Sequence, residues 1–159
     1  MIKLFRNAAV AMSAMMLATA PALAQQDAVE LTGGVELEQI VEAEDGTTTT
    51  VRVAPETIVP GDRLIFSTDY ANNGAETVTD FVVTNPLPSA VRLAPDADDN
   101  LVVSVDGGQQ WGTLDTLQVT GEDGNVRAAS HEDVTHIRWT LAELGAGASG
   151  SLEFPAIIR

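Results

Sequence analysis

The 159-residue sequence contains no cysteine and a single lysine, Lys3. All four methionines (Met1, Met12, Met15 and Met16) also lie near the amino terminus. The lack of cysteine excludes disulfides, a thiolate nucleophile and thiolate metal ligands. Beyond these first residues, a Schiff-base lysine and a thioether metal ligand are excluded as well. The fold must therefore be stabilised by burial, without a covalent crosslink.

The first 24 residues have the pattern of an export signal. Lys3 and Arg6 form a basic region, residues 8–17 form an apolar run, and Ala22-Leu23-Ala24 is a small-x-small cleavage site. The alternative is a retained transmembrane anchor, but the apolar run is shorter than the ~20 residues that a bilayer requires. We predict residues 1–24 as a signal peptide and expect the processed protein to be periplasmic or secreted, with no membrane insertion.

The charge is strongly one-sided. The chain carries 23 acidic residues against eight lysines and arginines, a net charge of −15 with histidine neutral. Loss of Lys3 and Arg6 with the signal would leave −17. Such a surface repels nucleic acid and anionic lipid headgroups, and it favours cations and basic partners. It would also simply keep an exported protein dispersed.

After the signal, apolar residues recur with a period of two, which is typical of half-buried strands. Short strands separated by Gly, Asp, Asn and Pro turns predict an all-β fold, an immunoglobulin-like antiparallel β-sandwich of about seven to eight strands. The expected strands include residues 35–43, 47–53, 64–70, 78–84, 101–105, 114–120, 137–141 and 151–158.

Residues 25–34 are expected to be a flexible lead-in, and residues 35–159 the sandwich domain. Residues 35–43 and 47–53 should pair as a hairpin. Trp139 is predicted as the main core anchor, because it lies on the apolar face of an alternating strand. The other predicted core residues are Leu64, Phe66, Tyr70, Phe81, Val83, Val103, Val105, Ile137, Leu152 and Phe154.

Several turns and strand ends form a recognisable series. Pro60 presets φ before Gly61 turns the chain, Gly74 is expected to take a positive φ in a hairpin, and Pro86 and Pro88 end a strand. The motifs are Val59-Pro60-Gly61-Asp62-Arg63-Leu64, Tyr70-x-Asn72-Asn73-Gly74 and Val82-Val83-Thr84-Asn85-Pro86-Leu87-Pro88, followed by Ser104-Val105-Asp106-Gly107-Gly108, Thr135-His136-Ile137-Arg138-Trp139 and Leu144-x-Ala146-Gly147-x-Ser149-Gly150.

This series resembles the bacterial domain of unknown function 11 repeat family, in its small, exported, single-domain form. The resemblance covers residues 55–159 and implies an immunoglobulin-like sandwich. Family members are usually inferred to be surface or envelope parts without assigned chemistry, so it implies an interaction or structural role. Many relatives carry tandem copies, whereas this chain has one, which disfavours a stalk or fibre.

Ser104-x-Asp106-x-Gly108-x-x-Trp111 matches the Asp-box pattern. In that pattern the aspartate accepts hydrogen bonds from turn amides and the aromatic ring packs beneath the hairpin. A single copy in a short chain predicts a stabilised hairpin and not a catalytic site.

Acidic loops are the candidates for metal binding. Asp96, Asp98, Asp99 and Asn100 concentrate the oxygen ligands that Ca²⁺ prefers, although Leu101 stands where an EF-hand loop needs glycine. Glu122-Asp123-Gly124-Asn125 is a second acidic turn. Acidic loops of this kind are usually just solvated turns, so the sequence predicts no cofactor and leaves Ca²⁺ as the one metal candidate.

The catalytic inventory is thin. His131 and His136 are the only histidines, and their odd separation would place them on opposite faces of a strand, away from a shared metal. Ser149 misses the G-x-S-x-G pattern by one place, and no spacing singles out a carboxylate pair. We therefore expect no enzyme activity.

We predict a non-catalytic exported envelope module that binds an envelope or cell-surface protein or glycan. The alternative is a Ca²⁺-binding or carbohydrate-binding accessory protein, suggested by the acidic loops and by Trp111 beside a turn.

Overall fold

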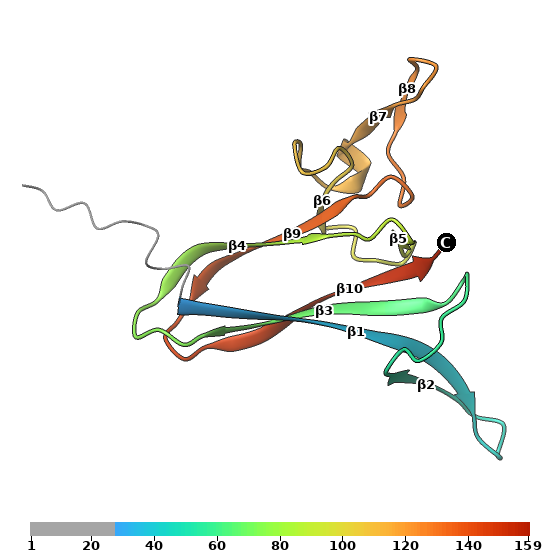
Figure 1. The fold of residues 1–159 in the computed structure, drawn as a ribbon, viewed down its shortest axis with the longest axis horizontal. Coiled ribbons are helices and arrows are strands. Elements are labelled where there is room, and N and C mark those ends of the chain that lie inside the picture. The colour runs from blue at the N-terminus through green and yellow to red at the C-terminus, as the bar shows by residue number, and fades with distance from the viewer. Residues whose placement is uncertain (1–27) are drawn as a thin grey trace, which may run out of the picture.

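The computed structural model describes residues 28–159, and the predicted signal peptide lies outside the described residues. Residues 28–159 form ten strands and the short 3-10 helix η2 (Figure 1). The elements are β1 (Val29–Glu42), β2 (Thr48–Val53), β3 (Arg63–Asn72), β4 (Val78–Pro86), β5 (Val91–Leu93), β6 (Val102–Ser104), η2 (Leu114–Thr116), β7 (Gln118–Thr120), β8 (Val126–Ala128), β9 (His136–Leu144) and β10 (Ser149–Ile158).

The strands form two antiparallel sheets that face each other and one small hairpin (Figure 1). One sheet has the order β2-β1-β3-β10-β5 and the other the order β4-β9-β6, while β7 pairs only with β8. The predicted all-β antiparallel sandwich is confirmed. There are more strands than the seven or eight expected, because β5 and β8 are three-residue pairings too short to show a period. No helix among residues 28–159 is long and apolar enough to cross a membrane.

The amino-terminal strand β1 begins earlier than the sequence predicted. Residues 29–34 pair with β3, from Val29 opposite Asn72 to Gly34 opposite Ser67, so the expected flexible lead-in is wrong for these residues. The adjacent glycines at 33 and 34 have the composition of a linker, and only the pairing with β3 reveals a strand. The predicted hairpin of residues 35–43 and 47–53 is confirmed by the pairing of β1 with β2.

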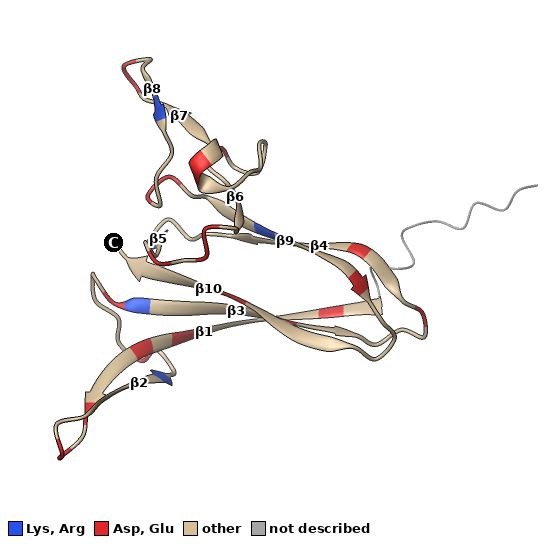
Figure 2. Cartoon of the chain, turned by 180° about the vertical axis from the view of Figure 1, so that it is seen from behind, with Lys and Arg blue, Asp and Glu red and all other residues tan. Residues whose placement is uncertain are grey.

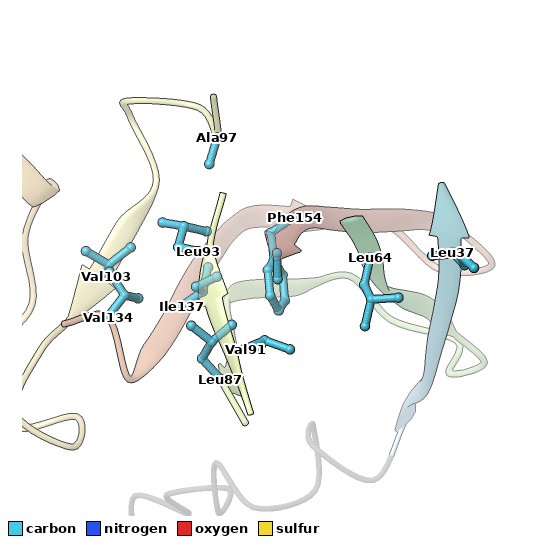
Figure 3. Packing of buried hydrophobic residues seen from close by; sticks show 11 residues of the cluster. Leu37, Leu64, Leu87, Val91, Leu93, Ala97, Val103, Val134, Ile137 and Phe154 are labelled. Carbon is cyan, nitrogen blue, oxygen red and sulfur yellow. The ribbon is translucent and has the colours of Figure 1, made fainter. Parts of the chain in front are cut away.

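Phe154 of β10 is the centre of the main core (Figure 3). Its side chain is 1% exposed, it stacks on Phe66 with ring centroids 5.1 Å apart, and it meets Trp139 at 6.0 Å. Trp139 itself is only partly buried at the edge of this cluster, so the prediction that it is the main anchor is wrong. A strand's period shows which face a residue occupies, but not how far the facing sheet covers it.

A second cluster closes the opposite end of the sandwich, where Val29, Val78 and Leu144 are buried together. Tyr70, Phe81 and Leu141 pack against it. The early start of β1 therefore supplies part of the core.

The predicted strand at 114–120 is largely wrong. Residues 114–116 form η2, and only Gln118–Thr120 extend as β7. Leu114 and Leu117 both pack against the core, and a spacing of three residues brings side chains onto one face of a 3-10 turn. The apolar pattern over these residues thus had a helical origin.

Gly74 also has a different role from the one predicted. The segment between β3 and β4 crosses from one sheet to the other, and Gly74 does not take a positive φ. A Cβ at Gly74 would lie 2.8 Å from the Cβ of Ala28, so glycine is needed for close approach. Gly61, by contrast, has a φ of 96° as a turn glycine should.

Candidate functional site

A cleft of about 660 Å³ opens where three loops meet beside β5 and β6. The loops are residues 97–101, residues 113–115 at the start of η2, and residues 129–131 before β9. The floor is apolar, with buried Leu93, Ala97 and Val103 beside partly buried Leu101 and Leu114. The rim is polar, and half of its six residues are acidic: it consists of Asp98, Asp99, Asn100, Asp115, Ser130 and His131.

The loop after β5 divides the predicted Ca²⁺ ligands. Asp96 does not line the cleft, because its Oδ1 accepts a hydrogen bond of 2.7 Å from Nη1 of Arg63. That bond lowers the pKa of the Asp96 carboxyl. Asp98, Asp99 and Asn100 do line the cleft, but Asp98 Oδ1 already accepts the backbone and side-chain N–H groups of Asn100, each at 2.9 Å.

The first of these Asn100 bonds, from the backbone N–H, is the main reason that the pKa of Asp98 is lowered. This Asx turn shapes the loop. Among residues 28–159, no group of three or more histidine, aspartate or glutamate side chains is arranged to hold a metal ion.

The wall at residues 129–131 is held by one carboxylate. Asp133 accepts two hydrogen bonds of 2.7 Å from the Arg127 guanidinium and further bonds of 2.8 Å from the backbone N–H and hydroxyl of Ser130. The Asp133 side chain is 16% exposed. The hydrogen bond from Arg127 is the main reason that the pKa of Asp133 lies well below its usual range. Asp133 thus fixes the position of this wall, and His131 lines the cleft.

The wall at η2 is joined to β6. Gly112 and Val103 exchange backbone hydrogen bonds of 2.8 and 3.1 Å, and the Thr116 hydroxyl donates to the Thr113 carbonyl at 2.7 Å. These bonds place Leu114 toward the core and leave Asp115 exposed at the rim.

The Asp-box segment forms the stabilised turn that its sequence predicts. Asp106 Oδ1 accepts the backbone N–H groups of Gln109 at 3.0 Å and Gln110 at 2.9 Å, and also the Ser104 hydroxyl at 2.8 Å. The Trp111 Nε1–H donates to the Gly108 carbonyl at 2.9 Å. These bonds account for the structural role. The hydrogen bond from the Gln110 backbone N–H is the main reason that the pKa of Asp106 is lowered.

Trp111 also covers Arg138 of β9. The centre of the guanidinium lies 3.6 Å from the ring centroid, and the ring of His136 meets Trp111 edge-on at 6.3 Å. Arg138 Nε is buried and has no hydrogen-bond partner among the described residues. The two histidines accordingly lie in different surroundings, His136 at Trp111 and His131 at the cleft.

Each of the six arginines in the described part of the chain has an internal partner. Arg138 stacks on Trp111, and the others pair with carboxylates. The paired carboxylates are Glu36, Glu38, Asp96, Glu132, Asp133 and Glu153. The cleft aspartates 98, 99 and 115 are not in this set. Figure 2 shows how acidic positions outnumber basic ones across the loops.

Sequence reasoning placed Asp98, Asp99 and Asn100 in a candidate site but missed Asp115 and the apolar floor. Asp115 is fifteen or more positions away along the chain, and no local motif connects it with the acidic loop. The only local signal was an apolar residue next to each acidic segment: Leu101 after Asn100 and Leu114 before Asp115. That signal becomes specific only when the loops are folded together.

No family model, curated protein or solved structure matches the chain. The resemblance to the domain of unknown function 11 family stays a prediction that depends on the motifs given above.

Proposed function

We propose that this protein is a non-catalytic binding module, exported to the periplasm or beyond, which uses the cleft between residues 97–101, 113–115 and 129–131 to hold a partner of the cell envelope or cell surface. The single observation that carries the proposal is the construction of the cleft. An apolar floor under a polar rim is the usual build of a recognition site, in which apolar contacts supply affinity and rim groups supply orientation.

Hydrogen bonds within the protein hold each of the three cleft walls in place, and this supports the proposal. Asp98 shapes one loop, Asp133 fixes the second and the bonds between Gly112 and Val103 hold the third. A site whose walls are fixed before binding loses less conformational entropy when it is occupied. Rigid walls around an apolar floor therefore favour a binding role.

We further propose that the sandwich is a variant of the immunoglobulin-like class and a member of the family that it resembles. In an immunoglobulin domain strands A and B pair in one sheet and strand C begins the other. Here β1 pairs with β3 in one sheet, and β4 is the first strand in the chain that belongs to the other. The last strand, β10, lies in the sheet of β1, whereas an immunoglobulin domain places its last strand in the sheet of strand C.

In-cell crosslinking with mass spectrometry tests the binding role. Carboxylate-reactive chemistry is required, because the chain has no lysine beyond Lys3. We expect crosslinks to a partner from Asp99 and Asp115, with loss of that partner when Leu114→Glu places a charge on the cleft floor. The matched control is Val126→Glu, which adds the same charge to a side chain that is 61% exposed on β8. Equal partner recovery from both variants, with both folded, would contradict the proposed site.

A second candidate function is Ca²⁺ or carbohydrate binding in an accessory role. It is favoured by the presence of Asp98, Asp99 and Asn100 along one rim. Calorimetry with millimolar Ca²⁺ tests the metal half of this candidate, with the Asp98→Asn and Asp99→Asn double variant as control. Heat that the double variant abolishes would favour it, and the absence of both heat and any rise in Tm would remove it.

A further inference from the structure

Building on the proposed function, we infer that the cleft binds a basic peptide segment of a partner protein, in which a bulky apolar side chain fills the floor and neighbouring arginines or lysines pair with the rim carboxylates. The cleft is formed by residues of this chain alone, and its floor, its rim and the charge balance of the whole molecule each contribute to this inference.

The floor selects the apolar part of the segment. Leu93 and Val103 are 2% and 1% exposed, and Leu101 and Leu114 extend the same apolar surface toward solvent. A volume of about 660 Å³ lies within the ~300–1,000 Å³ range of typical ligand sites. An aromatic or leucine side chain that enters would bury its surface against these residues, and aromatic anchors in such pockets usually dominate peptide binding.

The rim selects the charged part. Asp98 and Asp99 belong to the loop after β5, while Asp115 belongs to η2, so carboxylates stand on two separate walls. Among residues 28–159, no three such carboxylates are placed to share one metal ion. A peptide places basic side chains on both sides of an apolar residue, and this spacing suits two acidic walls around an apolar floor.

The excess of acidic residues in the molecule indicates that the bound segment is positively charged. The arginines of the described residues are all engaged internally, so the cleft aspartates receive no cation from that part of their own chain. A second copy would bring the same excess of carboxylates, with its own arginines equally engaged. A basic segment is attracted by the whole acidic surface before it reaches the cleft.

Calorimetry with four capped synthetic peptides tests the inference. The probe is Arg-Arg-Trp-Arg-Arg, and the three comparison peptides replace tryptophan with alanine, every arginine with citrulline, or every arginine with glutamate. We expect the probe to bind, the alanine peptide to bind ~10-fold or more weakly, and the citrulline and glutamate peptides to show no binding. Binding should also weaken as salt rises beyond about 0.15 M, since exposed charge pairs are screened.

Two double variants separate the cleft from the general acidic field. Asp99→Asn with Asp115→Asn should weaken the probe by ~3- to 10-fold, since exposed ion pairs contribute modestly. Glu44→Gln with Glu122→Gln removes the same charge at two exposed turns that do not line the cleft, and it should leave the affinity within about 2-fold. A benzophenone in place of the probe tryptophan should crosslink to Leu101 or Leu114.

Equal weakening by both double variants, or crosslinks outside the cleft, would overturn the inference by reducing it to non-specific attraction. Failure of the probe to bind would also overturn it. If a partner is still crosslinked in cells at Asp99 and Asp115, that failure leaves the proposed binding role in place. Loss of both the probe and the cellular crosslink would remove the proposed function as well.

Discussion

Asn72 is the residue whose role differs most from what its neighbours in sequence indicate. In the sequence it is the first residue of an Asn-Asn-Gly turn, but its side chain is 1% exposed and connects three segments. Its Nδ2 donates to the carbonyls of Glu76, Leu144 and Gly145 at 2.8, 3.0 and 3.1 Å, and its Oδ1 accepts the N–H of Gly74 at 3.0 Å. This side chain satisfies backbone groups that cross from one sheet to the other.

Asn72→Ala should therefore destabilise the protein by about 2–3 kcal/mol, because one buried and two partly buried carbonyls lose their donor and keep the cost of desolvation. Asn73→Ala is the control, since Asn73 is exposed and its side chain donates only to the Glu30 carboxylate, at 2.9 Å. The change should alter stability by less than ~0.5 kcal/mol. Urea denaturation followed by circular dichroism measures both. Similar losses would show that the network around Asn72 contributes little.

Phe154 and Trp139 provide a second comparison at the residue scale. Phe154→Ala should cost ~3–5 kcal/mol, because it removes a fully buried ring from contact with Phe66 and Trp139. Trp139→Ala should cost less, because the larger ring is only partly buried. The same urea measurement applies, and a greater loss for Trp139 would show that its position in the core is more central than its exposure indicates.

Among the elements, β1 carries the most informative correction. Its first residues form part of a core cluster, although the two glycines that follow have the composition of a linker. β2 pairs with β1 only from Leu37 onward, so within residues 28–159 the stretch 29–36 pairs on one side alone, with β3. The beginning of β1 is thus held by a single row of hydrogen bonds and by the burial of Val29.

Val29→Ala should cost about 1–3 kcal/mol, from two methyl groups and the space that they leave between Val78 and Leu144. Leu31 lies two residues further along the same face of β1, but its side chain is 45% exposed. Leu31→Ala should therefore cost less than ~1 kcal/mol of stability. Thermal melts of both variants provide the measurement. If neither variant lowers Tm, residues 29–34 would behave as the flexible lead-in that the sequence suggested.

At the scale of the whole molecule, five of the six described arginines pair with carboxylates of the same chain, so the stability of the fold depends on those carboxylates being ionised. Arg127 is the main cause of the lowered pKa of Asp133, and Arg63 is the main cause of the lowered pKa of Asp96. In the unfolded chain these carboxyls return to about 3.9, so as pH falls the unfolded state takes up the protons first. Their contribution to stability is complete above about pH 5 and is lost progressively as the pH falls below about 4.

Asp133→Asn should lower stability at neutral pH by about 1–2 kcal/mol and should make the acid-induced loss of stability less steep. Arg127→Gln should reproduce most of this flattening, because it removes the principal cause of the pKa shift. Urea midpoints measured from neutral pH down to about pH 2 provide the comparison. An unchanged pH slope in both variants would mean that this pair does not couple stability to protonation.

Part of the candidate site could be predicted from the sequence, and part could not. The acidic run at 96–100 was visible as a group of oxygen ligands, and the turn at Asp106 was visible as a motif, because both depend on residues a few positions apart. The hydrogen bond from Arg63 to Asp96 joins residues far apart in the sequence, and so does the placement of Asp115 on the cleft rim beside Asp98 and Asp99. Local composition contains no information on such contacts.

The sequence by itself determined the layered all-β fold, the strongly acidic surface and the exclusion of thiol chemistry, because alternation and composition are properties of the chain before it folds. The tertiary structure decided how far each apolar face is covered, where β1 begins and which acidic side chains meet at one cleft. These outcomes depend on how two sheets stack and where their loops come together. Stacking is determined by the combined shape of distant residues, and no short segment specifies it alone.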